Sequence, residues 1–180
     1  MSRPSASEYA PFYQTYINYT SGKDYSILVQ QYNERLIDSW TAVPIEKIKY
    51  SYAPDKWTIQ QMFQHVIDTE RIFAYRALAI ARKETIALPG FDENAYAKNA
   101  TAAHRQWKDM LVEWKVLRQS TNLMFASFTE EDFKQKGTAS GNTISVNALG
   151  FIIFGHTLHH LDRKSTRLNS SHVALSRMPS

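Results

Sequence analysis

The chain has 180 residues, of which 43% are hydrophobic and 13% aromatic, enough for one sizeable core in a single domain. It contains no cysteine, which excludes disulfides, thiolate nucleophiles and cysteine-bound zinc, so any metal must be held by histidine or carboxylate side chains. No apolar run approaches the roughly 20 residues that a membrane-spanning helix requires, and the polar N-terminus does not look like a secretory signal. We therefore expect a cytoplasmic protein without a membrane partner.

The net charge of +4 lies at the C-terminal end of the chain. Residues 163–180 hold four basic and no acidic residues, which leaves residues 1–162 neutral overall. A nucleic-acid partner is therefore not expected, because such a partner requires a basic face on the folded domain. Residues 163–180 also lack apolar periodicity, so we interpret 1–162 as the domain and 163–180 as a non-native or disordered tail.

Two helices are predicted in the first half of the chain. Apolar residues recur at spacings of three to five between Asp24 and Val43, which is typical of one buried helical stripe, and Pro44 ends it. Thr58 and Gln61 have the spacing of a capping box, and the apolar face after them predicts a helix from about residue 58 to 82.

Two further helices are predicted in the second half, at Trp107–Phe128 and Thr143–Leu161, with a loop at Gly137–Asn142 between them. The last of these helices is apolar on every side and should be buried, and its pattern stops at about Asp162. With no strand alternation recognised, the sequence predicts an all-α four-helix bundle. An N-terminal aromatic segment should pack across it: Tyr9, Phe12, Tyr13, Tyr16 and Tyr19.

Histidines give the sharpest chemical signal. His156 and His160 stand four residues apart, so on a helix their imidazoles can reach a single ion. His159 lies about 100° around the axis from His160 and need not share that ion. A third ligand must come from another helix, and His65 is the candidate. The alternative for these residues is a set of hydrogen-bonded core histidines without a metal.

Other polar and aromatic residues allow simpler interpretations. Asp68 could accept the second ring N–H of His65, or pair with Arg71 on the surface. His104 should be exposed in the first turn of the third helix. Four aromatic residues recur at core spacing and should form core or pocket wall rather than a stacking platform. They are Trp57, Tyr75, Trp107 and Trp114.

Three segments between residues 9 and 162 resemble the DinB-like superfamily of four-helix bundles, which includes YfiT-type metal-dependent hydrolases. They read KWTIQQMFQHVIDTERIFAYRALAIAR, LPGFDENAYA and SVNALGFIIFGHTLHH. The resemblance implies a divalent transition metal, such as nickel or zinc, bound by one histidine of the second helix and an H-x-x-x-H pair of the last. Those positions are His65, His156 and His160. It also implies a last helix that continues about two turns past the pair, where this chain has its tail.

For function, the resemblance implies a metal-dependent thiol S-transferase or hydrolase acting on a small electrophilic substrate, with a low-molecular-weight thiol as a candidate cosubstrate. Three imidazoles leave an open metal position that can bind water or a thiolate. No carboxylate stands beside the histidine pair in sequence, which slightly favours a transferase. The alternative is a non-catalytic, stress-related interaction module with a structural metal or none. The sequence names no catalytic residue and no organic cofactor, and leaves a homodimer open.

Overall fold

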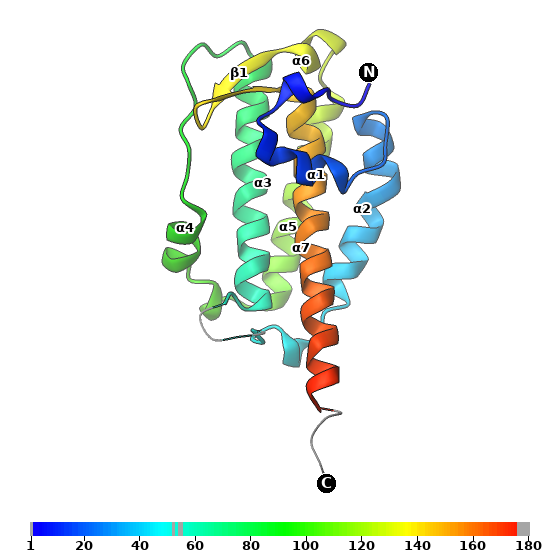
Figure 1. Ribbon diagram of the computed structural model, residues 1–180, viewed down its shortest axis with the longest axis vertical. Coiled ribbons are helices and arrows are strands. Elements are labelled where there is room, and N and C mark those ends of the chain that lie inside the picture. Colours follow the sequence, from blue (N-terminus) through cyan, green and yellow to red (C-terminus); the bar gives the residue numbers. More distant parts are fainter. Residues whose placement is uncertain (1, 52, 54–55, 176–180) are drawn as a thin grey trace.

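Four long helices form the body of the molecule (Figure 1). The computed structural model describes residues 2–51, 53 and 56–175, and for residues 165–175 the backbone alone. The long helices are α2 (Tyr25–Thr41), α3 (Ile59–Ala81), α5 (Trp107–Ala126) and α7 (Val146–Leu175). Both α2 and α3 contact α7 on one side and α5 on the other, so the order around the bundle is α2, α5, α3, α7. The predicted four-helix bundle is confirmed.

The direction of the helices requires one long crossover. In Figure 1, α2 and α7 run downward while α3 and α5 run upward. Because α3 and α5 are neighbours that point the same way, the chain between them must return along the outside of the bundle. Residues 82–106 make this return, and they include α4 (Glu93–Asn99) and a short 3-10 turn, Ala102–His104.

The predicted helix starts are confirmed by their caps. Asp24 accepts a hydrogen bond from the backbone N–H of Ile27 at 3.1 Å, which begins α2. At the start of α3, Thr58 and Gln61 bond each other's backbone N–H groups at 3.1 and 2.9 Å, the capping box expected from the sequence. These caps satisfy backbone donors that the first helical turn leaves without a partner.

A β-hairpin precedes α7, although no strand was predicted from the sequence. Its strands are β1 (Lys136–Ala139) and β2 (Asn142–Ser145), paired antiparallel. Ser140 and Gly141 connect them with φ values of 51° and 75°. A two-residue hairpin turn with both central residues at positive φ matches the twist of the flanking strands, which is why Ser-Gly fits here.

The hairpin corrects two predicted boundaries. The expected loop at Gly137–Asn142 is largely strand, and the last helix begins at Val146 instead of Thr143. The hairpin also holds the crossover, because the backbone of Leu88 bonds Thr138 and Ser140 at 2.8 and 3.1 Å. The strand edge therefore fixes the first part of the return segment, which then descends outside α3 (Figure 1).

The predicted end of the last helix at about Asp162 was wrong. Helix α7 continues to Leu175, because the chain has no glycine or proline between Gly155 and Pro179 that would interrupt it. Lys164 is buried and donates a hydrogen bond from Nζ to the carbonyl oxygen of Ser39 at 2.9 Å. The assignment of residues 163–180 to a tail outside the domain stays a prediction.

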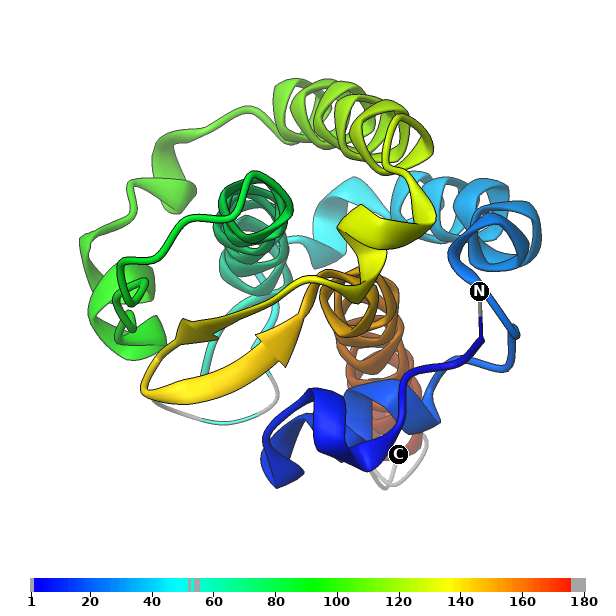
Figure 2. The ribbon, with the colours of Figure 1, turned by 90° about the horizontal axis from the view of Figure 1, so that it is seen from above.

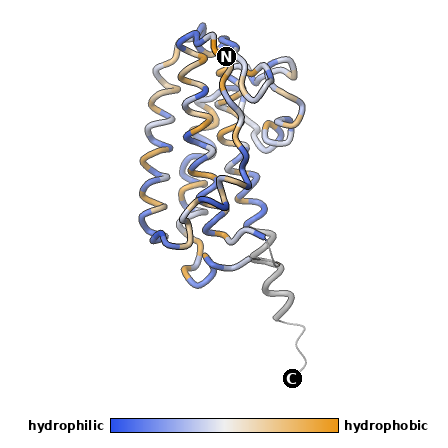
Figure 3. The backbone as a smooth tube through the Cα atoms, turned by 90° about the vertical axis from the view of Figure 1, so that its left-hand side faces the viewer, coloured by the Kyte–Doolittle hydropathy of each residue, from blue (hydrophilic) through white to orange (hydrophobic). Residues whose placement is uncertain are grey.

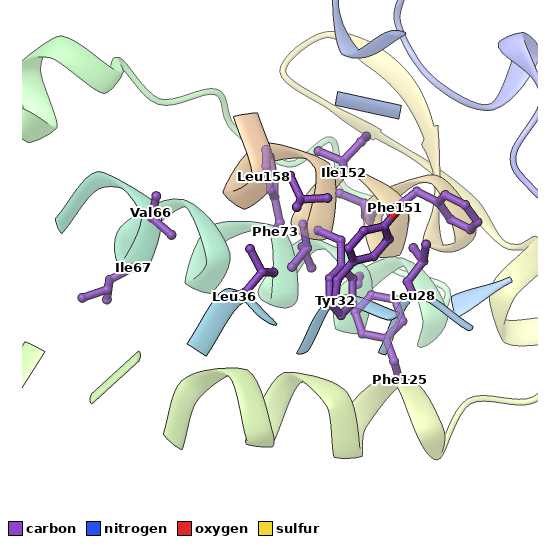
Figure 4. Packing of buried hydrophobic residues seen from close by; sticks show 14 of the residues in the cluster. Leu28, Tyr32, Leu36, Val66, Ile67, Phe73, Phe125, Phe151, Ile152 and Leu158 are labelled. Carbon is purple, nitrogen blue, oxygen red and sulfur yellow. The ribbon is translucent and has the colours of Figure 1, made fainter. Parts of the chain in front are cut away.

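The core surrounds α7. Residues 144–158 of the hairpin and helix are all buried, as expected for a helix that is apolar on every side. Figure 4 shows side chains of α2 and α5 meeting those of α7, and Figure 3 shows hydrophobic and hydrophilic residues alternating along the outer helices. Within the described part of the chain, no helix is long and apolar enough to cross a membrane.

The N-terminal aromatic segment packs across α7 as predicted (Figure 2). Helix α1 (Gln14–Asn18) approaches it so closely that a Cβ on Gly155 would lie 1.9 Å from the carbonyl oxygen of Tyr16. A backbone oxygen cannot move aside like a flexible side chain, so the glycine is required for this contact. The close approach places Tyr16 over the histidines of α7.

Candidate metal centre

Three buried histidines from two helices meet beneath α1. The Nε2 atom of His156 lies 3.0 Å from Nε2 of His65 and 3.1 Å from Nε2 of His160. In the described part of the chain, these three residues form the one group of histidine and acidic side chains whose ligand atoms all lie within 4.8 Å of one another. The structure therefore brings together the residues that the sequence predicted as ligands.

Neutral imidazoles cannot satisfy both contacts among themselves. The Nε2 atom of His156 carries either one proton or one lone pair, so it can complete only one of its two short contacts as a hydrogen bond. A metal ion gives all three lone pairs a partner at once. Imidazole nitrogens bind zinc at about 2.0–2.1 Å, which sets tetrahedral ligands about 3.3 Å apart, close to the separations observed here. The three side chains fit a divalent transition metal.

Burial keeps two of these imidazoles neutral. Desolvation lowers the pKa of His65 to about 4 and holds the pKa of His156 well below its ordinary value, with the neighbouring His160 lowering it further. A histidine must be neutral to bind a metal, so both are ready as ligands at pH 7.

The surroundings orient the rings. The Thr69 hydroxyl lies 3.4 Å from Nδ1 of His65, where it can accept the ring N–H and leave the Nε2 lone pair toward the cluster. The ring of Tyr16 meets His156 edge-on at 5.3 Å, and Trp57 lies 5.0 Å from His65. These aromatic rings shield the cluster from bulk water.

A polar pocket of about 260 Å³ leads to the cluster. His65 and His160 lie on its wall, while the charged groups around it come from other segments: Lys56, Glu93 and Arg163. A small polar molecule entering this pocket would meet both a metal ligand and side chains of either charge.

His159 belongs to the pocket wall and not to the ligand group, as expected. Its ring lies between the edges of Tyr16 and Tyr19, and among the described residues Nδ1 has no hydrogen-bond partner. Burial and the nearby Arg163 lower its pKa.

Neither role predicted for Asp68 is present. Its carboxylate accepts a hydrogen bond from Gln64 at 2.9 Å, whereas Thr69 faces the ring of His65. Arg71 pairs with Glu113 of α5 at 2.7 Å instead of with Asp68. The partner of Arg71 depends on which helix packs beside α3 at this level, and residue spacing along α3 does not predict that neighbour.

The predictions for His104 and for the aromatic residues are confirmed except at Tyr75. His104 is exposed, in the turn before α5. Trp107 and Trp114 are buried and Trp57 lies on the pocket wall, but Tyr75 is 59% exposed and lines a surface depression beside the crossover.

The charged residues of the pocket were not predicted from the sequence. Lys56 and Glu93 lie in segments between the long helices, and Arg163 lies beyond the predicted domain end. The acidic turn at Asp92 and Glu93 was the one available signal, because Asp92 caps α4 and so fixes Glu93 in its first turn.

Comparisons with known proteins agree with this architecture. The family model of the DinB superfamily matches residues 28–162, whereas the search of curated proteins gives no match. Among solved structures, YfiT from Bacillus subtilis, described as a probable metal-dependent hydrolase with an unusual four-helix bundle topology, superposes with a TM-score of 0.67 at 18% identity, covering 92% of this chain and 93% of that chain.

A second similar structure is the mycothiol-dependent maleylpyruvate isomerase, with a TM-score of 0.62 at 11% identity. The match covers 77% of this chain and 58% of the isomerase, so a large part of that enzyme has no counterpart here. At these identities the two structures show the fold. Because the family model spans most of the chain and both structures share its bundle, the chain belongs to the DinB superfamily.

Proposed function

We propose that His65, His156 and His160 bind one divalent transition metal, nickel or zinc, and that the protein uses it as a thiol S-transferase or hydrolase on a small electrophilic substrate. The observation that carries the proposal is the convergence of three buried Nε2 atoms, two of them 3.0 and 3.1 Å from the third. An ion held by three neutral imidazoles keeps its full charge and an open position, which lowers the pKa of a thiol or water that binds there.

The chain's own residues supply binding and shielding. Thr69 orients His65, and Tyr16 and Trp57 keep bulk water away from the cluster. The pocket joins the cluster to the surface, so a ligand can reach His65 and His160 from one side. Such access supports an open metal position over a closed structural site.

The pocket's charges favour a polar substrate or thiol. Lys56 and Arg163 can attract a carboxylate, and Glu93 can attract an ammonium group or accept a proton. Glu93 also weakens the argument for a transferase over a hydrolase, because a carboxylate that sequence proximity did not reveal stands in the pocket wall.

Metal analysis tests the site. Wild-type protein reconstituted with Zn²⁺ or Ni²⁺ and passed through a desalting column should hold about one metal per chain, because the described residues contain one such ligand group. His156→Ala should lose stoichiometric metal, because the Nε2 atom of His156 takes part in both short contacts. His104→Ala is the matched control, since His104 is exposed and outside the cluster. Metal-free wild type would refute the site.

Cobalt substitution tests the function. With an open position, the d–d bands of the Co²⁺ protein should change when a small thiol is added, and a sulfur charge-transfer band should appear. A spectrum that neither thiols nor azide change would mean a closed metal site. The enzyme hypothesis would then be wrong, and a non-catalytic module stabilised by the metal would take its place. Assays with several low-molecular-weight thiols and a model electrophile then identify the reaction class.

A further inference from the structure

A large groove lies away from the histidines. It is a groove of about 910 Å³ between α2 and α5, on the side of the bundle remote from α1 (Figure 2). Ligand sites for small molecules usually have 300–1,000 Å³ and an apolar wall with a few polar groups. The histidine pocket shares no residue with this groove, so the groove needs its own explanation.

The groove changes character along its length. At the end near the hairpin its wall is aromatic, formed by Tyr25, Phe125, Phe128 and Phe133. Tyr25 stacks on Phe125 with ring centres 4.4 Å apart, which makes this end a rigid apolar surface.

The other end is basic and polar. Lys115, exposed on α5, lies on its wall together with the polar side chains of Gln119 and Asn33. Lys115 and Ala126 are eleven residues apart on one helix, so the two ends of the groove are separated by about 16 Å.

Arg118 also contributes to the basic end and is 1% exposed. One guanidinium nitrogen, Nη2, bonds Glu70 and Thr157 at 2.8 and 3.0 Å. Among the described residues, its Nε and Nη1 atoms have no hydrogen-bond partner. Its guanidinium carbon lies 4.6 Å from the ring centre of Phe154, and Oε1 of Glu70 likewise has no partner among the described residues. Arg118 therefore belongs to a buried ion pair behind the groove wall.

We propose that this groove binds an amphipathic carboxylate of fatty-acid type, with its head group at Lys115 and its apolar chain along the aromatic end. Lys115 makes the first contact, because it is exposed. Arg118 lines the same end but stays paired with Glu70 behind the wall, so it reports a bound ligand without contacting it. The acidic side chain of the groove, Asp24, lies at the aromatic end and is engaged in capping α2, which fixes the orientation.

The test uses decanoate as the probe and 1-decanol as the head-group control, titrated into the full chain by calorimetry below micelle-forming concentrations. We expect one decanoate per chain and about fivefold weaker binding of decanol, the ratio that one exposed charge pair provides. Lys115→Gln should weaken decanoate to the level of decanol and leave decanol unchanged. In NMR spectra, decanoate should shift the Nε–H resonance of Arg118.

A matched pair of variants tests the position. Leu123, 66% exposed, lines the groove, and Val112, 61% exposed on the same helix, does not. Leu123→Asp should weaken both probes about tenfold, because it puts a carboxylate on the apolar wall, whereas Val112→Asp adds the same charge without effect. Binding of neither probe, or equal binding of both, overturns the proposal. So does a dimer that Leu123→Asp dissociates, which would assign the groove to a second copy.

Discussion

Glu70 and Arg118 are as deeply buried as the histidine cluster, and the two groups lie close together along α3 and α7. His65 precedes Glu70 by five residues on α3, and His156 is followed by Thr157, which bonds Arg118. In the ion pair a negative and a positive side chain meet at 2.8 Å, and Trp114 adds a second hydrogen bond to Glu70 at 3.0 Å. The chain supplies both charges there.

In the histidine cluster the chain supplies no opposite charges. Three neutral rings turn lone pairs or single protons toward one another, and they have no acidic partner in the ligand group. The ion pair is therefore complete in its charges without any ligand, while the histidine cluster lacks a cation. Buried polar residues at one depth thus serve stability in one place and binding in the other, and the difference lies in whether their charges cancel.

The largest effect is expected from breaking the ion pair. Arg118→Met leaves the Glu70 carboxylate buried without its cation, which should lower the free energy of unfolding by about 3–5 kcal/mol. Urea denaturation measures this loss. Arg71→Met is the control, because Arg71 is half exposed in its pair with Glu113 and should cost less than about 1 kcal/mol. Equal losses for both variants would contradict the comparison.

The histidine cluster should stabilise the fold only when a metal is present. At a metal concentration 100 times Kd, binding adds about 2.7 kcal/mol to the free energy of unfolding of the wild type. His156→Ala should abolish this increment while changing the metal-free protein little. Thermal melting with Zn²⁺ and with a chelator measures both states. A metal-free His156→Ala protein that is as destabilised as Arg118→Met would show that the histidines serve packing.

The sequence identified the three histidines that the structure brings together, because helical spacing indicates which of their side chains share a face; their role as ligands stays a prediction. His156 and His160 share a face at i,i+4, and His65 borders the apolar stripe of its own helix. The pocket charges could not be found this way: Glu93 reaches the site through a crossover held by the hairpin, and that hairpin went unrecognised although Ser140-Gly141 is a turn signal.

The ion pair was missed for a related reason. Glu70 and Arg118 stand on helices three and five of the structure, and their pairing depends on the order of helices around the bundle. Amphipathic patterns predict which face of a helix is buried, but not which neighbour covers it. Likewise the end of α7 was placed too early, because a change from apolar to basic residues does not break a helix that has no glycine or proline.

A substitution at Gly155 tests whether α1, which packs over the histidines, affects metal binding as well as stability. An added Cβ would lie 1.9 Å from the Tyr16 carbonyl oxygen, so Gly155→Ala must displace α1 and should cost about 1–3 kcal/mol. We also expect faster metal loss to a chelator, since Tyr16 shields His156. Gly90→Ala is the control, because its nearest contact of 3.5 Å is an ordinary van der Waals distance. Unchanged metal release would separate α1 from the site.

The smallest effect concerns the partly exposed ion pair of Glu113 with Arg71. Burial raises the pKa of Glu113, but hydrogen bonds from Arg105 and Arg71 outweigh it, so the pKa of this carboxyl lies below its ordinary value of 4.5. A carboxyl with a lower pKa in the folded state stabilises the fold above pH 4.5, and that stabilisation disappears as the pH falls through the folded pKa.

Glu113→Gln should therefore lower the free energy of unfolding at pH 7 by less than about 1 kcal/mol and converge with the wild type near pH 3. Urea denaturation from pH 7 to pH 3 measures the convergence. High salt should shrink the difference further, because the pair is accessible to screening ions, whereas the loss in Arg118→Met should stay nearly constant with salt. A salt-independent effect of Glu113→Gln would mean that its hydrogen bonds matter more than its charge, and exposure would then no longer explain why the two ion pairs differ in strength.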